Sequence, residues 1–247
     1  KKDIFLTFIF STIRLIICFI FAFFIIKFLI FIKFTSNKKI SKSYLRPILD
    51  FITRYGKFAF LILFLISLYR IADVVMGVMA NIFYLEKGYK ISEIATFSKF
   101  FGVFATIFGG FIGGYCSYKF GTMKALFFGA LVAALSNLLF AWLAISPISI
   151  NFLIAVITAD NISSGFAGAA FVIYLSGLTS IKFTATQYAL FSSIMLFLPK
   201  LIAGYAGSWV DVMGYAYFFS LTALLGLPVL YLIIWIGRAV SYTHLRA

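Results

Sequence analysis

The stretch "LISLYRIADVVMG", residues 65–77, places two opposite charges, Arg70 and Asp73, inside a long apolar run. The run extends from 58 to 83 and is long enough to cross a hydrocarbon core of about 30 Å as a helix. An ionisable side chain at bilayer depth costs at least roughly 2.5–3.5 kcal/mol, so it usually faces a partner or a water-filled cavity. The stretch therefore predicts a membrane helix that carries either an ion pair or part of a polar pathway.

The composition of the whole chain agrees with a membrane protein. Hydrophobic residues make up 64% of the 247 residues and charged residues only 11%, which is not the composition of a water-soluble domain. We predict an all-α integral membrane protein, because helices satisfy their own backbone hydrogen bonds inside a bilayer. Seven apolar runs have about the length of a span: 15–32, 58–83, 94–115, 125–145, 150–176, 183–207 and 213–237.

The formal net charge of +14 could indicate nucleic-acid binding, but its position along the chain indicates membrane topology instead. Lysine and arginine gather in residues 33–57 and recur in 117–124, whereas 146–149 carries no charge. By the positive-inside rule, the two basic segments face the cytoplasm and 146–149 faces the opposite side. We expect no nucleic-acid partner.

Four parts of the chain differ in character. They are a preceding membrane segment (1–34), a basic cytoplasmic linker (35–57), a six-helix half-domain (58–237) and a tail (238–247). Arg14 and Lys27 interrupt the first segment, and we favour a single span in which Lys27 reaches toward the interface. An interfacial helix followed by a shorter span is the open alternative. The tail ends in "SYTHLRA", typical of a sequencing scar, and we leave it out of functional reasoning.

Within the six later spans, charges near mid-span are rare: Arg70, Asp73, Asp160 and Lys200. Arg70 and Asp73 are three residues apart and can pair with each other, so a purely structural ion pair is one interpretation. Asp160 and Lys200 have no opposite charge in their own spans. Each needs a partner from another helix or a solvated pocket, and both are candidates for function.

Asp160 lies in "ADNISSGFAGAAF", residues 159–171, where Asn161 is followed by small residues. Small residues at a spacing of four let membrane helices approach closely, which explains the glycines without any function. Close packing does not require an acid and an amide at mid-depth. We therefore add Asn161 to the candidate residues.

The loop after 94–115 reads "GGYCSYKFGTMKA", with Gly114, Lys119, Gly121 and Lys124 in the pattern G-x-x-x-Y-K-x-G-x-x-K. It resembles the cytoplasmic signature of the major facilitator superfamily, in which an acidic residue stands where this chain has Tyr118. Tight glycine turns and basic residues at cytoplasmic helix ends are the chemistry of that signature.

A closer resemblance covers most of residues 46–237 and is to the C-terminal half of AmpG-type muropeptide permeases. It rests on six local strings. They are "LYRIADVVMG", "FFGVFATIFGGFIGG", "LSNLLFAWLAI" and "FTATQYALFSSI", together with "DNISSGFAGAAFV" and "PKLIAGYAGSWVD" as a pair that carries an acidic and a basic residue.

The resemblance implies a proton-coupled importer of anhydromuropeptides in the bacterial inner membrane, built from two six-helix halves around a cavity. This chain would supply the second half, and the missing N-terminal half would be its partner. The first and fourth helices of each half line the cavity in that fold. Asp73 and Asp160 are then candidates for proton coupling, and Arg70, Asn161 and Lys200 for substrate binding.

Other classes fit less well. An enzyme would need a catalytic cluster, yet the sequence has no HExxH motif, serine triad or metal-ligand spacing, so we expect no catalysis, metal or cofactor. ATP-driven transport lacks a GxxxxGK[ST] loop. A membrane-embedded structural subunit does not account for the four mid-span charges. A transporter of another anionic solute is the main alternative.

Overall fold

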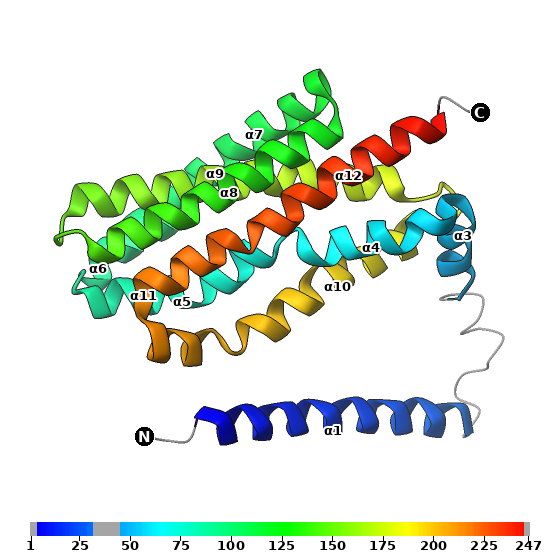
Figure 1. Cartoon of the computed structure of the whole chain (residues 1–247), viewed down its shortest axis with the longest axis horizontal. Helices are drawn as coiled ribbons and strands as arrows, with labels where there is room; N and C mark the ends of the chain where they lie inside the picture. The colour runs from blue at the N-terminus through cyan, green and yellow to red at the C-terminus, as the bar shows by residue number, and fades with distance from the viewer. Residues whose placement is uncertain (1–3, 32–44, 245–247) are drawn as a thin grey trace.

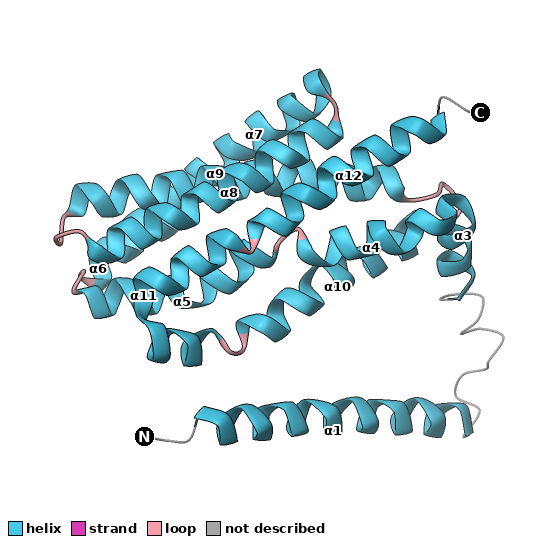
Figure 2. Ribbon diagram, viewed as in Figure 1, coloured by secondary structure: helices cyan, strands magenta, loops and turns pink. Residues whose placement is uncertain are grey.

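The computed structural model describes residues 4–31 and 45–244, and every regular element in this part of the chain is a helix (Figure 2). The prediction of an all-α protein is confirmed. In chain order the elements are α1 (Ile4–Phe31), α3 (Arg46–Tyr55), η2 (Gly56–Phe58), α4 (Ala59–Leu68), α5 (Ile71–Lys87), α6 (Ile91–Ile94), η3 (Ala95–Phe101), α7 (Gly102–Phe120), α8 (Thr122–Ile145), α9 (Ile150–Leu178), α10 (Thr184–Ala203), α11 (Ala206–Leu224) and α12 (Gly226–His244).

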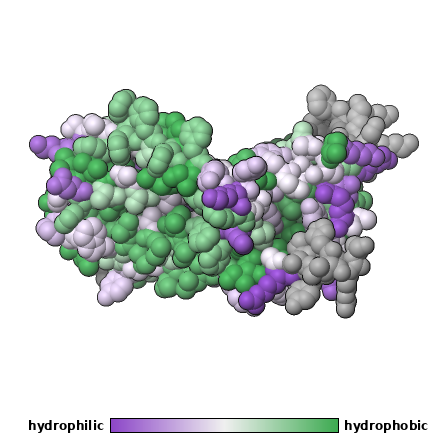
Figure 3. Space-filling model, turned by 90° about the horizontal axis from the view of Figure 1, so that it is seen from above, coloured by the Kyte–Doolittle hydropathy of each residue, from purple (hydrophilic) through white to green (hydrophobic). Residues whose placement is uncertain are grey.

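Six segments of the described chain are long and apolar enough to cross a membrane, and each overlaps one of the spans predicted between 58 and 237. Hydrophobic side chains cover much of the face shown in Figure 3. The chain is therefore a multi-pass membrane protein. The segments are Arg46–Lys87, Ile91–Phe120, Thr122–Ile145, Ile150–Leu178, Thr184–Ala203 and Ala206–Ala239.

Four described glycines have positive φ angles, Gly56, Gly88, Gly121 and Gly214, and two of them bear on the predicted boundaries between spans. Gly121 (φ 88°) forms the one-residue turn between α7 and α8, as expected for a glycine of the signature loop. Gly214 (φ 76°, ψ 166°) interrupts α11, and the helix resumes after it and is followed by α12. The chain thus reverses near Gly214, close to the boundary predicted between the last two spans.

Helix α1 is one uninterrupted helix of 28 residues, drawn below α10 and α11 in Figure 1. The Thr12 and Tyr205 hydroxyl oxygens are 3.0 Å apart, which links α1 to the chain between α10 and α11. Its sequence is apolar along almost the whole helix, apart from Arg14, Lys27 and a few hydroxyl residues. Lys27 is exposed and its ammonium lies 5.5 Å from the centre of the Phe23 ring. Whether α1 crosses the membrane stays a prediction.

Aromatic rings hold α5, α8 and α11 together. Phe83 of α5 packs on Phe219 of α11, with 5.0 Å between ring centres, and Phe219 lies 5.2 Å from Phe140 of α8. Phe140 and Phe219 are fully buried. Since side chains of this size dominate core energetics, the cluster fixes α5 against α8.

Helices α7 and α9 pack backbone to backbone through glycine. A Cβ atom at Gly109 would collide with the Ile162 carbonyl, and one at Gly165 would collide with the Thr106 carbonyl. The small residues after Asp160 therefore do allow the close approach that their spacing predicts. The contact sets the rotation of α9, and with it the direction in which Asp160 and Ser164 point.

Candidate functional site

The span predicted at 58–83 is broken at its centre. Helix α4 ends at Leu68 and α5 begins at Ile71, with Arg70 (φ −96°, ψ 8°) in the N-cap position of α5. Asp73 lies in the first turn of α5. The N-terminus of a helix carries partial positive charge, which favours a carboxylate there. The two residues that interrupt the apolar run therefore stand at a discontinuity of the membrane helix.

Arg70 connects α5 with α9. Its guanidinium lies 3.4 Å from an Asp73 carboxylate oxygen, and both side chains are largely shielded, with 20% and 15% of their surface exposed. The guanidinium also donates to the Ser164 hydroxyl at 3.4 Å and to the Ser164 carbonyl at 3.5 Å. Gly168 lies beside it, and a Cβ at that position would make an ordinary van der Waals contact of 3.5 Å with the guanidinium. The i, i+3 pair that the spacing predicts is present.

Tyr69 anchors the break. It is buried and its ring stacks on Phe171 of α9, with centres 4.3 Å apart. Its hydroxyl donates to the Leu126 carbonyl at 3.2 Å and lies 3.5 Å from the Ala167 carbonyl. Because the Tyr69 ring is fixed between α8 and α9, the backbone of the neighbouring Arg70 has little freedom. The position of Arg70 is therefore set before any ligand binds.

Asp160 lies one helical turn before Ser164 on α9 and is half-buried. Its carboxylate accepts a long hydrogen bond, 3.5 Å, from the Ser136 hydroxyl of α8. Among the described residues it belongs to no ion pair, although the charges of Asp73 and Arg70 act on it. The Ser136 and Ser163 hydroxyl oxygens are 3.1 Å apart and extend this polar patch. Asp160 thus has hydroxyl neighbours in place of a dedicated counter-ion.

Two other predicted residues lie elsewhere. Asn161 accepts from the Thr106 hydroxyl at 3.0 Å and donates to the Ile157 carbonyl at 2.8 Å, so its amide joins α9 to α7. Lys200 is exposed near the end of α10, and its ammonium makes no hydrogen bond or ion pair within the described residues. The structure brings together Arg70, Asp73 and Asp160 but neither of these two, whose substrate role stays a prediction.

Neutral polar residues of α8 were missed by reasoning from charges. Asn137 is fully buried and donates to the Ala72 carbonyl at 3.3 Å, just before Asp73 in the chain. Its amide oxygen has no partner within the described residues, which is costly for a buried polar atom. The signal was present in "LSNLLFAWLAI", where a serine and an asparagine interrupt an apolar span. Asn137 joins Ser136 and Ser164 as a candidate site residue.

The signature loop is a compact turn with exposed cations. Lys119 places its ammonium 5.6 Å from the Tyr115 ring centre and 5.5 Å from that of Phe120. Lys124 is exposed in the first turn of α8. Gly114 lies inside α7, and a Cβ there would meet nothing within 4 Å. Of the two glycines, only Gly121 is required by backbone conformation.

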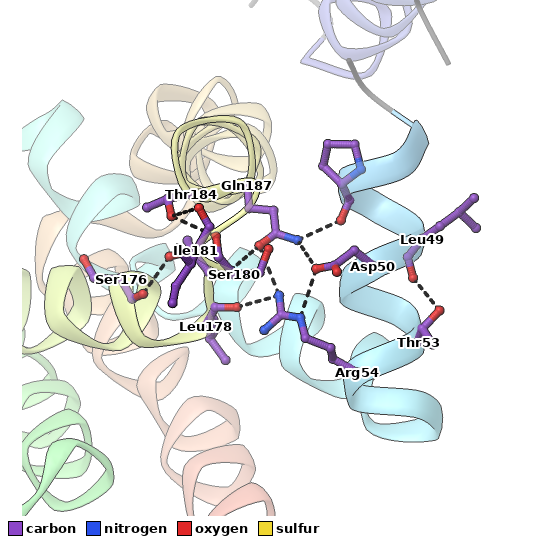
Figure 4. Close-up of polar contacts among 12 residues, drawn as sticks. Leu49, Asp50, Thr53, Arg54, Ser176, Leu178, Ser180, Ile181, Thr184 and Gln187 are labelled. Carbon is purple, nitrogen blue, oxygen red and sulfur yellow. Dashed lines mark hydrogen bonds and ion pairs between the residues drawn. The ribbon is translucent and has the colours of Figure 1, made fainter. Parts of the chain in front are cut away.

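A second polar cluster lies where α3 meets the turn between α9 and α10 (Figure 4). The sequence predicted a basic linker here, and the structure shows that residues 46–55 of it form a helix. The fully buried Gln187 of α10 donates to the Pro47 carbonyl at 2.8 Å and to the Asp50 carboxylate at 3.0 Å. We call this cluster the α3 latch; its members are Pro47, Asp50, Arg54, Leu178, Ser180 and Gln187.

Arg54 completes the latch. It pairs with Asp50 at 3.0 Å, donates to the Gln187 amide oxygen at 3.0 Å and donates to the Leu178 carbonyl at 3.1 Å. The Ser180 amide donates to the same Gln187 oxygen at 2.7 Å. All four hydrogen-bonding positions of the Gln187 amide are therefore occupied. The latch ties the segment that precedes α4 to the end of α9, the helix that carries Asp160.

No group of three or more His, Cys, Asp or Glu side chains in the described residues could hold a metal ion. The arrangement around Arg70 offers different chemistry. A shielded guanidinium, two carboxylates and several hydroxyls surround a broken membrane helix, a combination suited to binding anions and exchanging protons at mid-membrane.

The described residues form a helical membrane protein with a polar cluster at a break in one span, and the proteins it resembles are named as transporters. No family model matches the chain. The chain is 36% identical over 197 residues, 80% of its length, to a Rickettsia felis protein named "Putative transporter AmpG 4". It is 35% identical over 197 residues to the protein of the same name from Rickettsia conorii, and 34% identical over 191 residues to "Putative transporter AmpG 1" of Rickettsia bellii.

These matches confirm the resemblance to AmpG-type permeases that the local strings indicated. The chain spans about half the length of the curated relatives it matches, 47% of the Rickettsia felis and Rickettsia conorii proteins and 45% of the Rickettsia bellii protein.

Proposed function

We propose that the chain forms the C-terminal half of a secondary transporter that imports anhydromuropeptides with protons across the bacterial inner membrane. The observation that carries the proposal is the cluster of Arg70, Asp73 and Asp160 at a break in a membrane helix. The similarity to proteins named as putative AmpG transporters supports the class.

Arg70 would bind an anionic group of the substrate. Its guanidinium is already oriented by Asp73 and Ser164, through contacts of 3.4 to 3.5 Å that are long enough to yield to a stronger partner. A substrate carboxylate can take the place of Asp73 and form a bidentate contact. Such a charge-assisted interaction contributes roughly 1.5–3 kcal/mol.

Substrate binding at Arg70 would then be linked to protonation. When the guanidinium turns to the substrate, Asp73 loses its counter-ion at membrane depth, and binding a proton removes the uncompensated charge. Asp160 lies within range of the charges of Arg70 and Asp73. Among the described residues, the only hydrogen bond to its carboxylate comes from Ser136 and is long, so little holds Asp160 in one protonation state. The two carboxylates can therefore carry the proton, with the serines as relay groups.

Uptake of labelled solutes tests this proposal. A complete transporter that contains this chain would be expressed in cells without their own muropeptide permease. We expect uptake of labelled anhydromuropeptide that is competed by unlabelled anhydromuropeptide and not by a sugar phosphate or a nucleotide. If those two anions compete and anhydromuropeptide does not, the proposed substrate is wrong, and the protein is a transporter of another anionic solute. Absence of any uptake from a well-expressed protein would remove the transport proposal itself.

A further inference from the structure

A groove of about 530 Å³ lies between the beginning of α8 and the later part of α12. The two helices run antiparallel, since Ala134 of α8 lies next to Gly226 while Met123 lies next to Gly237. A Cβ at Gly237 would be 3.8 Å from the Met123 methyl carbon, so these residues form the floor of the groove. The remaining lining residues are Lys124, Phe127, Phe128, Ile233, Ile234 and Arg238.

The lining is ordered by depth. In α8, Lys124 comes first and Phe127 and Phe128 follow about one turn later. In α12 the order is reversed, and Arg238 follows Ile234 by about one turn. Because the helices are antiparallel, both cations lie at the same end of the groove. The basic loops predict that this end faces the cytoplasm.

The cations are not neutralised by the protein. Lys124 and Arg238 are exposed, and neither belongs to an ion pair within the described residues. The deeper walls are equally open, with 49% of the Phe128 surface and 43% of the Ile234 surface exposed. Both residues lie in candidate membrane spans, and their side chains are exposed on the described part of the chain.

We propose that this groove binds one anionic phospholipid of the cytoplasmic leaflet. The phosphodiester of the headgroup lies between Lys124 and Arg238, and an acyl chain follows the groove along Phe128 and Ile234. Charge at one end and apolar walls one turn deeper match the order of groups in a phospholipid. Basic pockets between membrane helices on the cytoplasmic side bind anionic headgroups in this way. The site is separate from the Arg70 cluster and does not depend on the transported solute.

Native mass spectrometry of the full chain in neutral detergent tests the site. Phosphatidylglycerol is titrated into wild-type protein and into the double variant Lys124→Gln and Arg238→Gln. A cation near an anionic lipid surface is worth about fivefold in affinity, so the double variant should bind the first phosphatidylglycerol about 25-fold more weakly. The matched control is the double variant Lys119→Gln and Lys182→Gln, which removes the same charge outside the groove.

The outcomes separate specific binding from attraction to charge in general. We expect the control variant and the wild type to bind phosphatidylglycerol alike, and phosphatidylcholine to bind equally to all three proteins. Equal affinity of the groove variant and the wild type would overturn the proposal, as would an equal loss in the control. Displacement of the lipid by glycerol phosphate at the same concentration would also overturn it, because the acyl chain would then contribute nothing.

A variant of the apolar wall provides independent evidence. Ile234→Asn keeps both cations and is placed on an exposed position, so it should fold. We expect it to bind phosphatidylglycerol at least about fivefold more weakly, since a buried methylene contact is replaced by a polar amide. Unchanged affinity in this variant would contradict an acyl chain in the groove.

Discussion

At the scale of single residues, the proposed site is built around Arg70. A shielded guanidinium must have partners, and it has Asp73 on its own helix and Ser164 on α9. Asp160 differs because it has hydroxyl neighbours and no ion pair in the described residues. One carboxylate is therefore engaged with the cation and the other is held loosely, an asymmetry that suits binding and proton exchange at one place.

The Arg70 and Asp73 pair gives a direct test of mutual dependence. Either Arg70→Leu or Asp73→Leu should destabilise the protein by about 3–5 kcal/mol, because each leaves an uncompensated charge in a shielded place. The double variant with both leucines should recover most of the thermal stability and still fail to transport. Thermal unfolding in detergent, measured beside uptake, checks this. A double variant as unstable as the single ones would show that the pair is not a self-contained unit.

At the scale of helices, the close contact between α7 and α9 holds in place the helix that carries Asp160 and Ser164. Gly109→Ala should destabilise the bundle by about 1–3 kcal/mol or more, because its Cβ meets the Ile162 carbonyl, which is backbone and cannot move aside cheaply. Gly110→Ala is the matched control, since its Cβ would only come within 3.9 Å of the Gly165 carbonyl. Thermal unfolding of both variants measures this difference in stability. Equal stability of the two would contradict the close approach of these helices.

The α3 latch is the second helix-level feature. Gln187→Met removes every hydrogen bond of the buried amide and leaves the Pro47 carbonyl and Ser180 amide without partners. Amide hydrogens of α3 should then exchange at least about tenfold faster, which hydrogen-exchange mass spectrometry resolves. Thr184→Val is the control, because the Thr184 hydroxyl bonds only the neighbouring turn at Ser180 and Ile181. Unchanged protection of α3 in Gln187→Met would mean that other contacts hold it.

Much of this helix arrangement could be predicted from the sequence, and the rest could not for physical reasons. The length of an apolar run indicates a membrane span directly, so six spans were predicted near their observed positions. The break at Arg70 and the helix at 46–55 were not predicted, because both depend on tertiary contacts. The break depends on the packing of Tyr69 on Phe171, and the helix depends on its hydrogen bonds with Gln187.

The candidate site shows the same division. Charges at membrane depth are conspicuous in a sequence, so Arg70, Asp73 and Asp160 were found. Asn137 was not, since a neutral amide in an apolar run is a weaker signal than a charge, and its burial is known only from the structure. Lys200 and Asn161 were predicted from their mid-span positions, the missing counter-ion of Lys200 and the resemblance to AmpG-type permeases, none of which says which way a side chain points.

At the scale of the whole molecule, the topology can be measured directly. We expect exposed single cysteines at Tyr118→Cys and Ile181→Cys to be labelled only from the cytoplasmic side, and Ile148→Cys only from the outer side. The native Cys18 and Cys116 are first replaced by serine or alanine. An impermeant maleimide on sealed cells gives the answer. Labelling of position 118 from outside would reverse the assigned orientation of the bundle.

The central claim is that substrate and proton meet at one cluster, and proton movement on substrate addition tests it most directly. Proteoliposomes that hold the complete transporter, with no imposed gradient, receive anhydromuropeptide while the external pH is recorded. We predict alkalinisation outside for the wild type. For Asp160→Asn we predict none, although substrate exchange across the membrane persists, because an amide keeps hydrogen bonds but cannot carry a proton. Substrate uptake by the wild type without alkalinisation, or alkalinisation by Asp160→Asn at the wild-type rate, would contradict the account.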